Sequence, residues 1–199
     1  MQPQLHFSTP IWHYSCSTSN MKELNKSLVA DAYKLRKEER TQSVSGVNSW
    51  QSHRSVHSLP MVGGFFSAIS DIITTLLEPH GTPNLTFAVE GAWFNINPPM
   101  SWNERHNHRG HAYAGVYILQ KPTDSGELLF HDPRVQLTAV PAHPPNNPLI
   151  DGQRRNANAQ VGDVVIFPSW LEHSVSLNKS TGDRISLAFN MGWERPASK

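Results

Sequence analysis

The chain has 199 residues and a formal net charge of +1, and its 17 basic and 16 acidic residues are spread along the sequence. This length suits one domain with a sizeable core, and the balanced charge gives no sign of a nucleic acid partner. A single cysteine, Cys16, excludes an intrachain disulfide, and no apolar stretch approaches the roughly 20 residues of a membrane span. We expect a single domain over 1–199 in a cytoplasmic protein without membrane attachment.

The first 40 residues predict a strand and a helix. Residues 5–14 are apolar and aromatic, which favours an opening strand interrupted at Pro10. Asn20 and Glu23 then form the capping-box-like start of a helix. An apolar stripe over 24–35 continues that helix and predicts the face that packs on the rest of the domain.

A second helix is expected before residue 80. Residues 41–57 are rich in Ser, Gly and Asn and predict a surface loop. Gly63-Gly64 opens the next apolar helical pattern, which ends at Glu78-Pro79 and Gly81. Together the two helices form the expected support of the domain, roughly 20–80.

From residue 85 onward the pattern changes to short apolar runs separated by Pro and Gly. These runs predict strands over 85–97, 112–120, 127–131, 164–167 and 184–190. The stretch 139–158 contains four prolines and predicts a long, turn-rich insertion. Helices at the front followed by strands alone favour an α+β, mostly β domain whose sheets close into a sandwich or barrel, roughly over 85–195.

Three histidines have the spacing of a metal site. His106 and His108 lie two residues apart, at the end of an expected strand or in its exit loop, where residues i and i+2 project to the same face. His173 follows an apolar strand and a turn, and can reach the same point from elsewhere in the barrel. Three neutral imidazoles on one face suit a redox metal whose other positions stay open. The alternative is a polar histidine cluster without metal.

Arg184 and Ser186 predict a binding site for a carboxylate. They share one face of an expected strand that starts eleven residues after His173. A guanidinium binds a carboxylate through two parallel hydrogen bonds, and a neighbouring hydroxyl adds another donor. The alternative is a surface arginine at the start of a strand.

Four segments, taken in order, resemble the consecutive signatures of a 2-oxoglutarate and iron(II)-dependent oxygenase family that is often found in bacteria and phages. They are HNHRGHAYAGVYILQ (106–120), SGELLFHDPR (125–134), VGDVVIFPSWLEHSV (161–175) and RISLAFN (184–190). The resemblance implies a double-stranded β-helix, that is, a jelly-roll or cupin-like fold, with the two N-terminal helices packed on it. It also implies Fe(II) and 2-oxoglutarate as cofactors, O2 as a cosubstrate, and hydroxylation coupled to decarboxylation of 2-oxoglutarate to succinate.

The resemblance also assigns the metal ligands. His106 and His173 match the two ligand histidines, whereas His108 stands where the wider superfamily has a carboxylate. Glu104 lies two residues before His106 on the same expected face, and Asp132 follows the strand over 127–131. Either carboxylate remains a reserve for the third ligand, and no catalytic residue beyond the metal ligands is expected.

For 2-oxoglutarate, Arg184 and Ser186 match the positions that hold the distal carboxylate. Related enzymes often add a tyrosine on the strand after the first ligand pair, where this chain has Ile118. Asn97 and Asn95 are the expected donors in place of that hydroxyl.

Two other functions stay open at the level of the sequence. A three-histidine cupin dioxygenase shares the histidine spacing but does not use 2-oxoglutarate, and it needs no Arg184 and Ser186 pair. A non-enzymatic barrel that binds a sugar or a small acid would use the histidines as polar pocket residues. The sequence does not identify the primary substrate.

Overall fold

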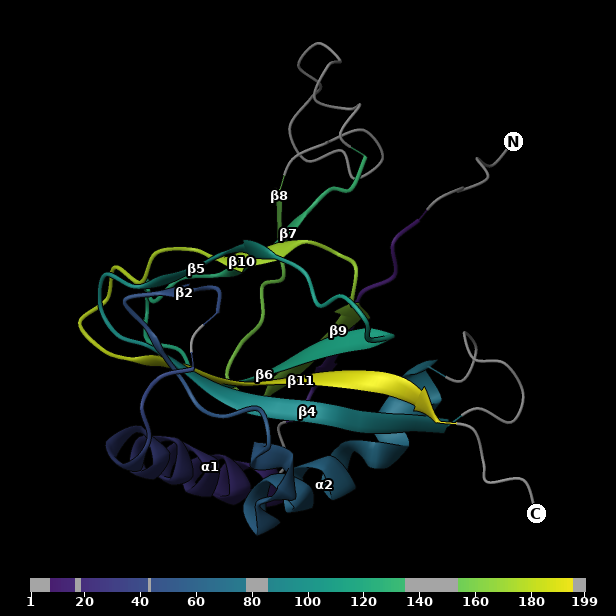
Figure 1. Ribbon diagram of the computed structural model, residues 1–199, viewed down its shortest axis with the longest axis horizontal. Helices are drawn as coiled ribbons and strands as arrows, with labels where there is room; N and C mark the ends of the chain where they lie inside the picture. The colour runs from purple at the N-terminus through teal and green to yellow at the C-terminus, as the bar shows by residue number, and fades with distance from the viewer. Residues whose placement is uncertain (1–7, 17–18, 43, 78–85, 135–153, 195–199) are drawn as a thin grey trace.

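The protein is described by a computed structural model over residues 8–16, 19–42, 44–77, 86–134 and 154–194. It is mostly β, with two helices and two antiparallel sheets (Figure 1). The helices are α1 (Ser19–Glu38) and α2 (Pro60–Leu77), and a short 3-10 helix, η1 (Val56–Ser58), precedes α2. In these parts of the chain, no helix combines the length and the apolar character that crossing a bilayer requires.

The larger sheet has six strands in the order β1-β9-β6-β11-β4-β3. These strands are β1 (Trp12–Ser15), β3 (Trp50–Gln51), β4 (Thr86–Asn97), β6 (Tyr113–Gln120), β9 (Asp163–Pro168) and β11 (Arg184–Glu194). The smaller sheet, in the order β2-β5-β10-β7-β8, contains β2 (Gly46–Val47), β5 (Trp102–His106), β7 (Leu128–His131), β8 (Arg154–Asn156) and β10 (His173–Val175). From β4 to β7, and again from β9 to β11, successive strands alternate between the sheets.

The main core lies between the larger sheet and the two helices. On β11, Ile185, Leu187 and Phe189 are fully buried in the same cluster as Leu28 of α1 and Phe65 of α2. Figure 1 shows both helices against one face of this sheet, with the smaller sheet on the other side. Because strand side chains alternate between faces, the even-numbered residues of β11 from 184 to 190 point toward the smaller sheet.

A second, smaller core lies between the two sheets. Ile118 of β6, Phe130 of β7 and Phe167 of β9 are buried in it. Polar side chains from β4, β5, β10 and β11 line a pocket beside this core. The space between the sheets is therefore filled by apolar side chains in one part and contains a pocket lined by polar side chains in the other.

A pair of glycine variants tests the packing of the larger sheet. A Cβ at Gly115 would overlap the ring of Phe189, whereas one at Gly64, on the exposed side of α2, meets nothing within 4 Å. We expect Gly115→Ala to lower the free energy of unfolding by about 1–3 kcal/mol through overpacking. Gly64→Ala should raise it by about 0.5–1 kcal/mol, because alanine favours helix more than glycine does. Urea denaturation of both variants measures the difference, and equal effects would contradict this packing.

The predicted mostly β architecture with two helices in front is confirmed, and strands cover each of the five runs predicted from residue 85 onward. Of the opening strand predicted over 5–14, the described residues form a strand only from Trp12. The predicted start of the second helix is wrong, since α2 begins at Pro60 rather than Gly63, and proline is favoured in a first helical turn. Strands β2, β3, β8 and β10 were not predicted because two or three residues carry no periodic pattern. Residues 1–7, the expected helix end at 78–81 and most of the insertion lie outside the described residues.

Candidate functional site

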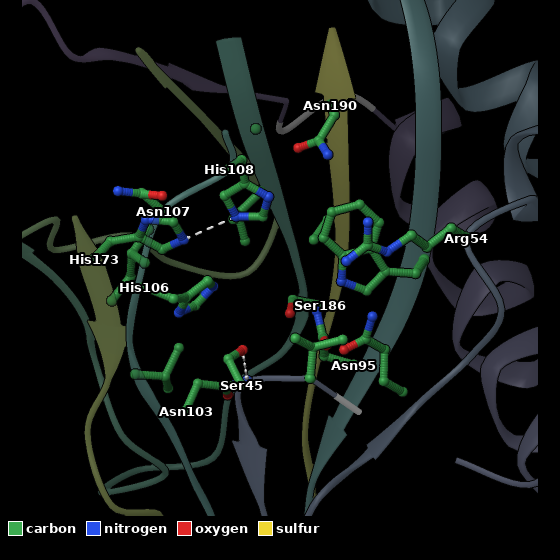
Figure 2. A pocket seen from close by; sticks show the side chains of 18 of the residues that line it. Ser45, Arg54, Asn95, Asn103, His106, Asn107, His108, His173, Ser186 and Asn190 are labelled. Atoms are coloured by element: carbon green, nitrogen blue, oxygen red, sulfur yellow. Dashed lines mark hydrogen bonds between the residues drawn. The ribbon is translucent and has the colours of Figure 1, made fainter. Parts of the chain in front are cut away.

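Three imidazoles meet in the pocket between the sheets (Figure 2). His106 ends β5 and lies opposite His173, the first residue of β10, with ring centroids 4.3 Å apart. His108 follows β5, and its Nε2 lies 3.2 Å from Nε2 of His173. One ring nitrogen from each histidine lies within 4.8 Å of the others, and no other His, Cys, Asp or Glu group of this kind occurs in the described residues. The structure therefore brings the three predicted ligands together.

The ring nitrogens of two of these histidines have defined roles. Nδ1 of His106 lies 2.7 Å from the carbonyl oxygen of Glu104, and Nδ1 of His173 lies 3.0 Å from that of Leu171. A carbonyl only accepts, so each Nδ1 carries the proton and each Nε2 keeps its lone pair. This is the arrangement in which metal-ligating histidines are usually held. Both rings are thus suited to bind a cation through Nε2.

His108 reaches the cluster from a loop. Its backbone N–H donates to the carbonyl of Ser169 at 2.8 Å, and Ser169 N–H donates to the carbonyl of Ala112 at 3.2 Å. The Trp93 ring stacks on His108 with centroids 5.6 Å apart. The convergence with His106 therefore comes from the loop contacts and not from the strand pleat that the spacing of two residues suggested.

Burial keeps the three imidazoles neutral. Desolvation lowers the pKa of His106, although the hydrogen bond to the Glu104 carbonyl raises it in part. Desolvation, followed by the charge of His106, lowers the pKa of His108 to about 3. The pKa of His173 is well below its ordinary value for the same two reasons. Neutral rings at neutral pH present lone pairs, which fits them for a divalent cation.

The two reserve carboxylates lie outside the cluster. Glu104 is exposed, and its Oε1 accepts a hydrogen bond from Trp102 Nε1 at 2.8 Å. The expectation that Glu104 shares a face with His106 is wrong, because the pairing of β5 with β10 contains an irregularity. Between the His106–His173 and Asn103–Val175 pairs, two residues of β5 lie opposite one residue of β10, which breaks the alternation of faces. Asp132 instead accepts hydrogen bonds from Arg134, with Nη2 to Oδ2 at 2.6 Å.

Arg184 lines the same pocket as the histidines. Its side chain is 1% exposed, and its Nε has no hydrogen-bond partner in the described residues. Burial lowers the pKa of Arg184 to about 10, opposed in part by Glu127, whose carboxylate pairs with Lys121 at 2.8 Å. Arg184 remains a cation at neutral pH, and a buried, unpaired cation is costly unless an anion accompanies it.

Polar side chains around Arg184 come from β4 and β11. Ser186 shares its face, as predicted, and Asn95 is the β4 partner of Ser186. Asn97, in contrast, does not line the pocket. Its Nδ2 donates to Oδ1 of Asn103 at 2.9 Å, so it supports a pocket residue from behind. Asn95 is thus the better placed of the two expected donors.

Several pocket residues were not predicted from the sequence. They are Arg54, Trp93, Asn103, Asn107 and Asn190. Asn190 continues the alternation of Arg184 and Ser186 along β11, so the period of two was a usable signal for it. Arg54 comes from the segment before η1, and no local pattern connects it with the barrel.

Comparisons with known proteins agree with this geometry. A family model described as "Putative 2OG-Fe(II) oxygenase" matches residues 91–190. No curated protein matches the sequence of this chain. Among solved structures, a prolyl-4-hydroxylase from Pseudomonas putida is similar at 16% identity and a TM-score of 0.65, over 96% of this chain and 95% of that chain.

Two further solved structures are similar in fold. HygX from Streptomyces hygroscopicus, solved with nickel and 2-oxoglutarate, has 11% identity and a TM-score of 0.64, over 92% of this chain and 83% of that chain. The epimerase SnoN, solved with Fe3+, alpha ketoglutarate and nogalamycin RO, has 16% identity and a TM-score of 0.66, over 92% of this chain and 79% of that chain. At these identities the likeness shows the fold.

Proposed function

Because the chain belongs to the 2OG-Fe(II) oxygenase family, we propose that it couples the oxidative decarboxylation of 2-oxoglutarate to hydroxylation of a substrate in the pocket between its sheets. The observation that carries this proposal is the pairing, in one pocket, of a neutral three-histidine cluster with a buried and unpaired arginine. The cluster suits a divalent metal, and the arginine suits an anion. Iron(II) and 2-oxoglutarate meet both requirements.

His106, His108 and His173 would hold the iron through their Nε2 atoms. The backbone carbonyls of Glu104 and Leu171 fix two of the rings from behind, so the ligands are oriented before the metal binds. Bound iron and 2-oxoglutarate supply the oxidising chemistry for which protein side chains have no equivalent, with O2 consumed and succinate formed. The protein's part is to bind, orient and shield the reactants.

Arg184 would bind the distal carboxylate of 2-oxoglutarate. Its guanidinium offers a planar fork of N–H donors, and Ser186 adds a hydroxyl from the same face of β11. Asn95 is the donor closest in the sheet to Ser186 and would take the role of the tyrosine hydroxyl that Ile118 cannot supply. Ile118 lies in the apolar core between the sheets.

The alternation of strands between the sheets supports the finer fold that we propose, a double-stranded β-helix of the jelly-roll type formed by one domain. The single cysteine supports a cytoplasmic location.

The histidine cluster and Arg184 together distinguish this function from its alternatives. A three-histidine cupin dioxygenase does not use 2-oxoglutarate, so its histidine spacing does not by itself require Arg184 and Ser186 on one face of β11. A non-enzymatic barrel would bind a ligand, but it would not bind iron tightly and would not form succinate. The oxygenase assignment uses both features of the pocket.

Anaerobic titration of the iron-loaded chain with 2-oxoglutarate tests the proposal. We expect a visible charge-transfer band from a ferrous 2-oxoglutarate complex, and slow formation of succinate when oxygen is admitted. A chain that binds iron but shows neither the band nor succinate would contradict the function. Oxidation of a thiol under the same conditions would favour the cupin alternative.

Variants of His108 test which residue supplies the third ligand. We expect His108→Ala to lose bound iron, and His108→Asp to keep a single iron, because a carboxylate at this position forms a two-histidine, one-carboxylate site. Glu104→Gln and Asp132→Asn are the controls and should keep full occupancy. Metal analysis after gel filtration measures all four. Full occupancy in His108→Ala, with loss in either control variant, would assign the third ligand to that carboxylate.

A further inference from the structure

With iron(II) bound, the pocket would carry more positive charge than the two carboxylates of 2-oxoglutarate can neutralise. Arg54, Arg109 and Arg184 line it, and no Asp or Glu of the described residues does. Within the same part of the chain, neither Arg54 nor Arg109 forms an ion pair with a carboxylate. The two carboxylates of 2-oxoglutarate offset Arg184 and half of the charge of iron(II), which three neutral histidines leave undiminished. Further negative charge would therefore be stabilised in this pocket.

Arg54 lines the pocket and contacts β4 through both its backbone and its side chain. Its carbonyl accepts a hydrogen bond from the N–H of Ala92 on β4 at 2.9 Å. Its guanidinium carbon lies 5.4 Å from the ring centroid of Trp93. The Trp93 ring in turn stacks on His108. The Trp93 ring therefore lies between Arg54 and the candidate metal ligand His108, and a group bound by Arg54 would be close to the metal site.

Arg54 and Arg184 differ in their access to solvent. Arg184 is a fully buried part of the pocket lining, whereas Arg54 is exposed. Figure 2 shows Arg54 across the pocket from His106 and His173, with Ser186 between them. A cosubstrate common to every turnover suits the buried arginine, and a molecule that enters and leaves past the rim suits the exposed one.

We propose that the primary substrate carries an oxyanion, a carboxylate or a phosphate group, that Arg54 binds beside Trp93. The inference rests on the proposed function and adds the chemical class of its substrate. An arginine whose guanidinium carbon lies over the face of an aromatic ring keeps N–H edges available, and these match the oxygens of either group. Arg109, in the loop after His108, supplies a second cation at the same pocket.

The test uses the full chain loaded with Mn(II) in place of iron, under nitrogen and saturated with 2-oxoglutarate, so that Arg184 is already occupied. Calorimetric titrations compare phenylacetate with phenylacetamide, which has the same shape without the charge, and with phenyl phosphate. We expect at least one of the two acids to bind roughly 5- to 20-fold more tightly than the amide. The factor is modest because solvent screens a charge at an exposed site, so a hydrogen bond to it contributes less free energy than it would in the protein interior. Which acid binds more tightly separates carboxylate from phosphate.

Three variants assign this preference to a residue. Arg54→Gln should remove the difference between acid and amide, and Arg54→Lys should keep part of it, because a point charge attracts but does not offer the fork. Arg40→Gln removes an exposed arginine outside the pocket and should change nothing. Thermal unfolding and the affinity for 2-oxoglutarate are measured first. They show whether each variant is folded and whether Arg184 still binds the cosubstrate.

The inference is overturned if neither acid binds more tightly than the amide to the parent chain, or if the preference survives in Arg54→Gln. A parent chain that fails to bind 2-oxoglutarate contradicts the proposed function instead, and the charge balance with it. That failure appears in the first titration, before any probe is added, so the two results are distinguished.

Discussion

Replacing Arg184 with Gln is expected to weaken the binding of 2-oxoglutarate by roughly 10- to 150-fold. A hydrogen bond to a charged group contributes about 1.5–3 kcal/mol, and about 1.4 kcal/mol corresponds to a factor of ten in affinity. Arg184 is fully buried, so the carboxylate that it binds loses its water and depends on the guanidinium for compensation. Glutamine keeps a donor but loses the charge.

Iron binding should change little in Arg184→Gln, because the three histidines do not contact Arg184 through any hydrogen bond found in the described residues. Arg184→Lys should recover part of the affinity, since it keeps the charge without the two-pronged geometry. Spectroscopic titration under nitrogen measures both, with Arg40→Gln as the control. If Arg184→Gln binds 2-oxoglutarate as tightly as the parent chain, Arg184 does not anchor the cosubstrate.

Replacing His173 with Ala is expected to lower the affinity for iron(II) by at least about 100-fold. Loss of a residue that only orients a metal ligand costs up to about 100-fold in affinity, and loss of a ligand itself should cost at least as much. His173 is 4% exposed and lies near both partners, with Nε2 of His108 at 3.2 Å and the ring of His106 at 4.3 Å between centroids. Without it, two imidazoles remain and the site loses its third ligand. Activity should fall with the metal.

His111→Ala is the matched control for this variant. His111 lines the same pocket but pairs with Glu90 and lies outside the three-histidine group. It should therefore retain iron at the parent level. Metal analysis and competition with a chromophoric chelator give the affinities of both variants. Equal iron affinity in His173→Ala and the parent chain would exclude the cluster as the metal site.

The elements that the sequence predicted well are those with a clear period. Strands β4 and β11 are 12 and 11 residues long, and their apolar side chains cover the helices at every second position. This alternation also placed Arg184 and Ser186 on one face, where both line the pocket. Helix α2 was recognised from its apolar stripe, although its first turn was missed because Pro60 was not counted as a helical residue.

Local pattern failed where a side chain's direction depends on a neighbouring strand. The irregular pairing of β5 with β10 turns Glu104 outward, although it lies two residues from His106. Asn97 has the right period to face the pocket but is engaged by Asn103, which leaves Asn95 as the pocket residue. A strand's own sequence does not record either contact.

The types of side chain that the chemistry needs can be read from the chain alone: two histidines two residues apart, a distant third, and an arginine with a serine on one strand. Their order along the chain was sufficient for the family resemblance, because the family's signatures are short and local. That the imidazoles meet depends on long-range contacts, since His106 and His173 become partners through β5–β10 pairing and His108 is placed by the carbonyl of Ser169. The contact of Arg54 with Trp93 is likewise a property of the folded chain, because a contact between a loop and a strand almost forty residues later leaves no period in the sequence.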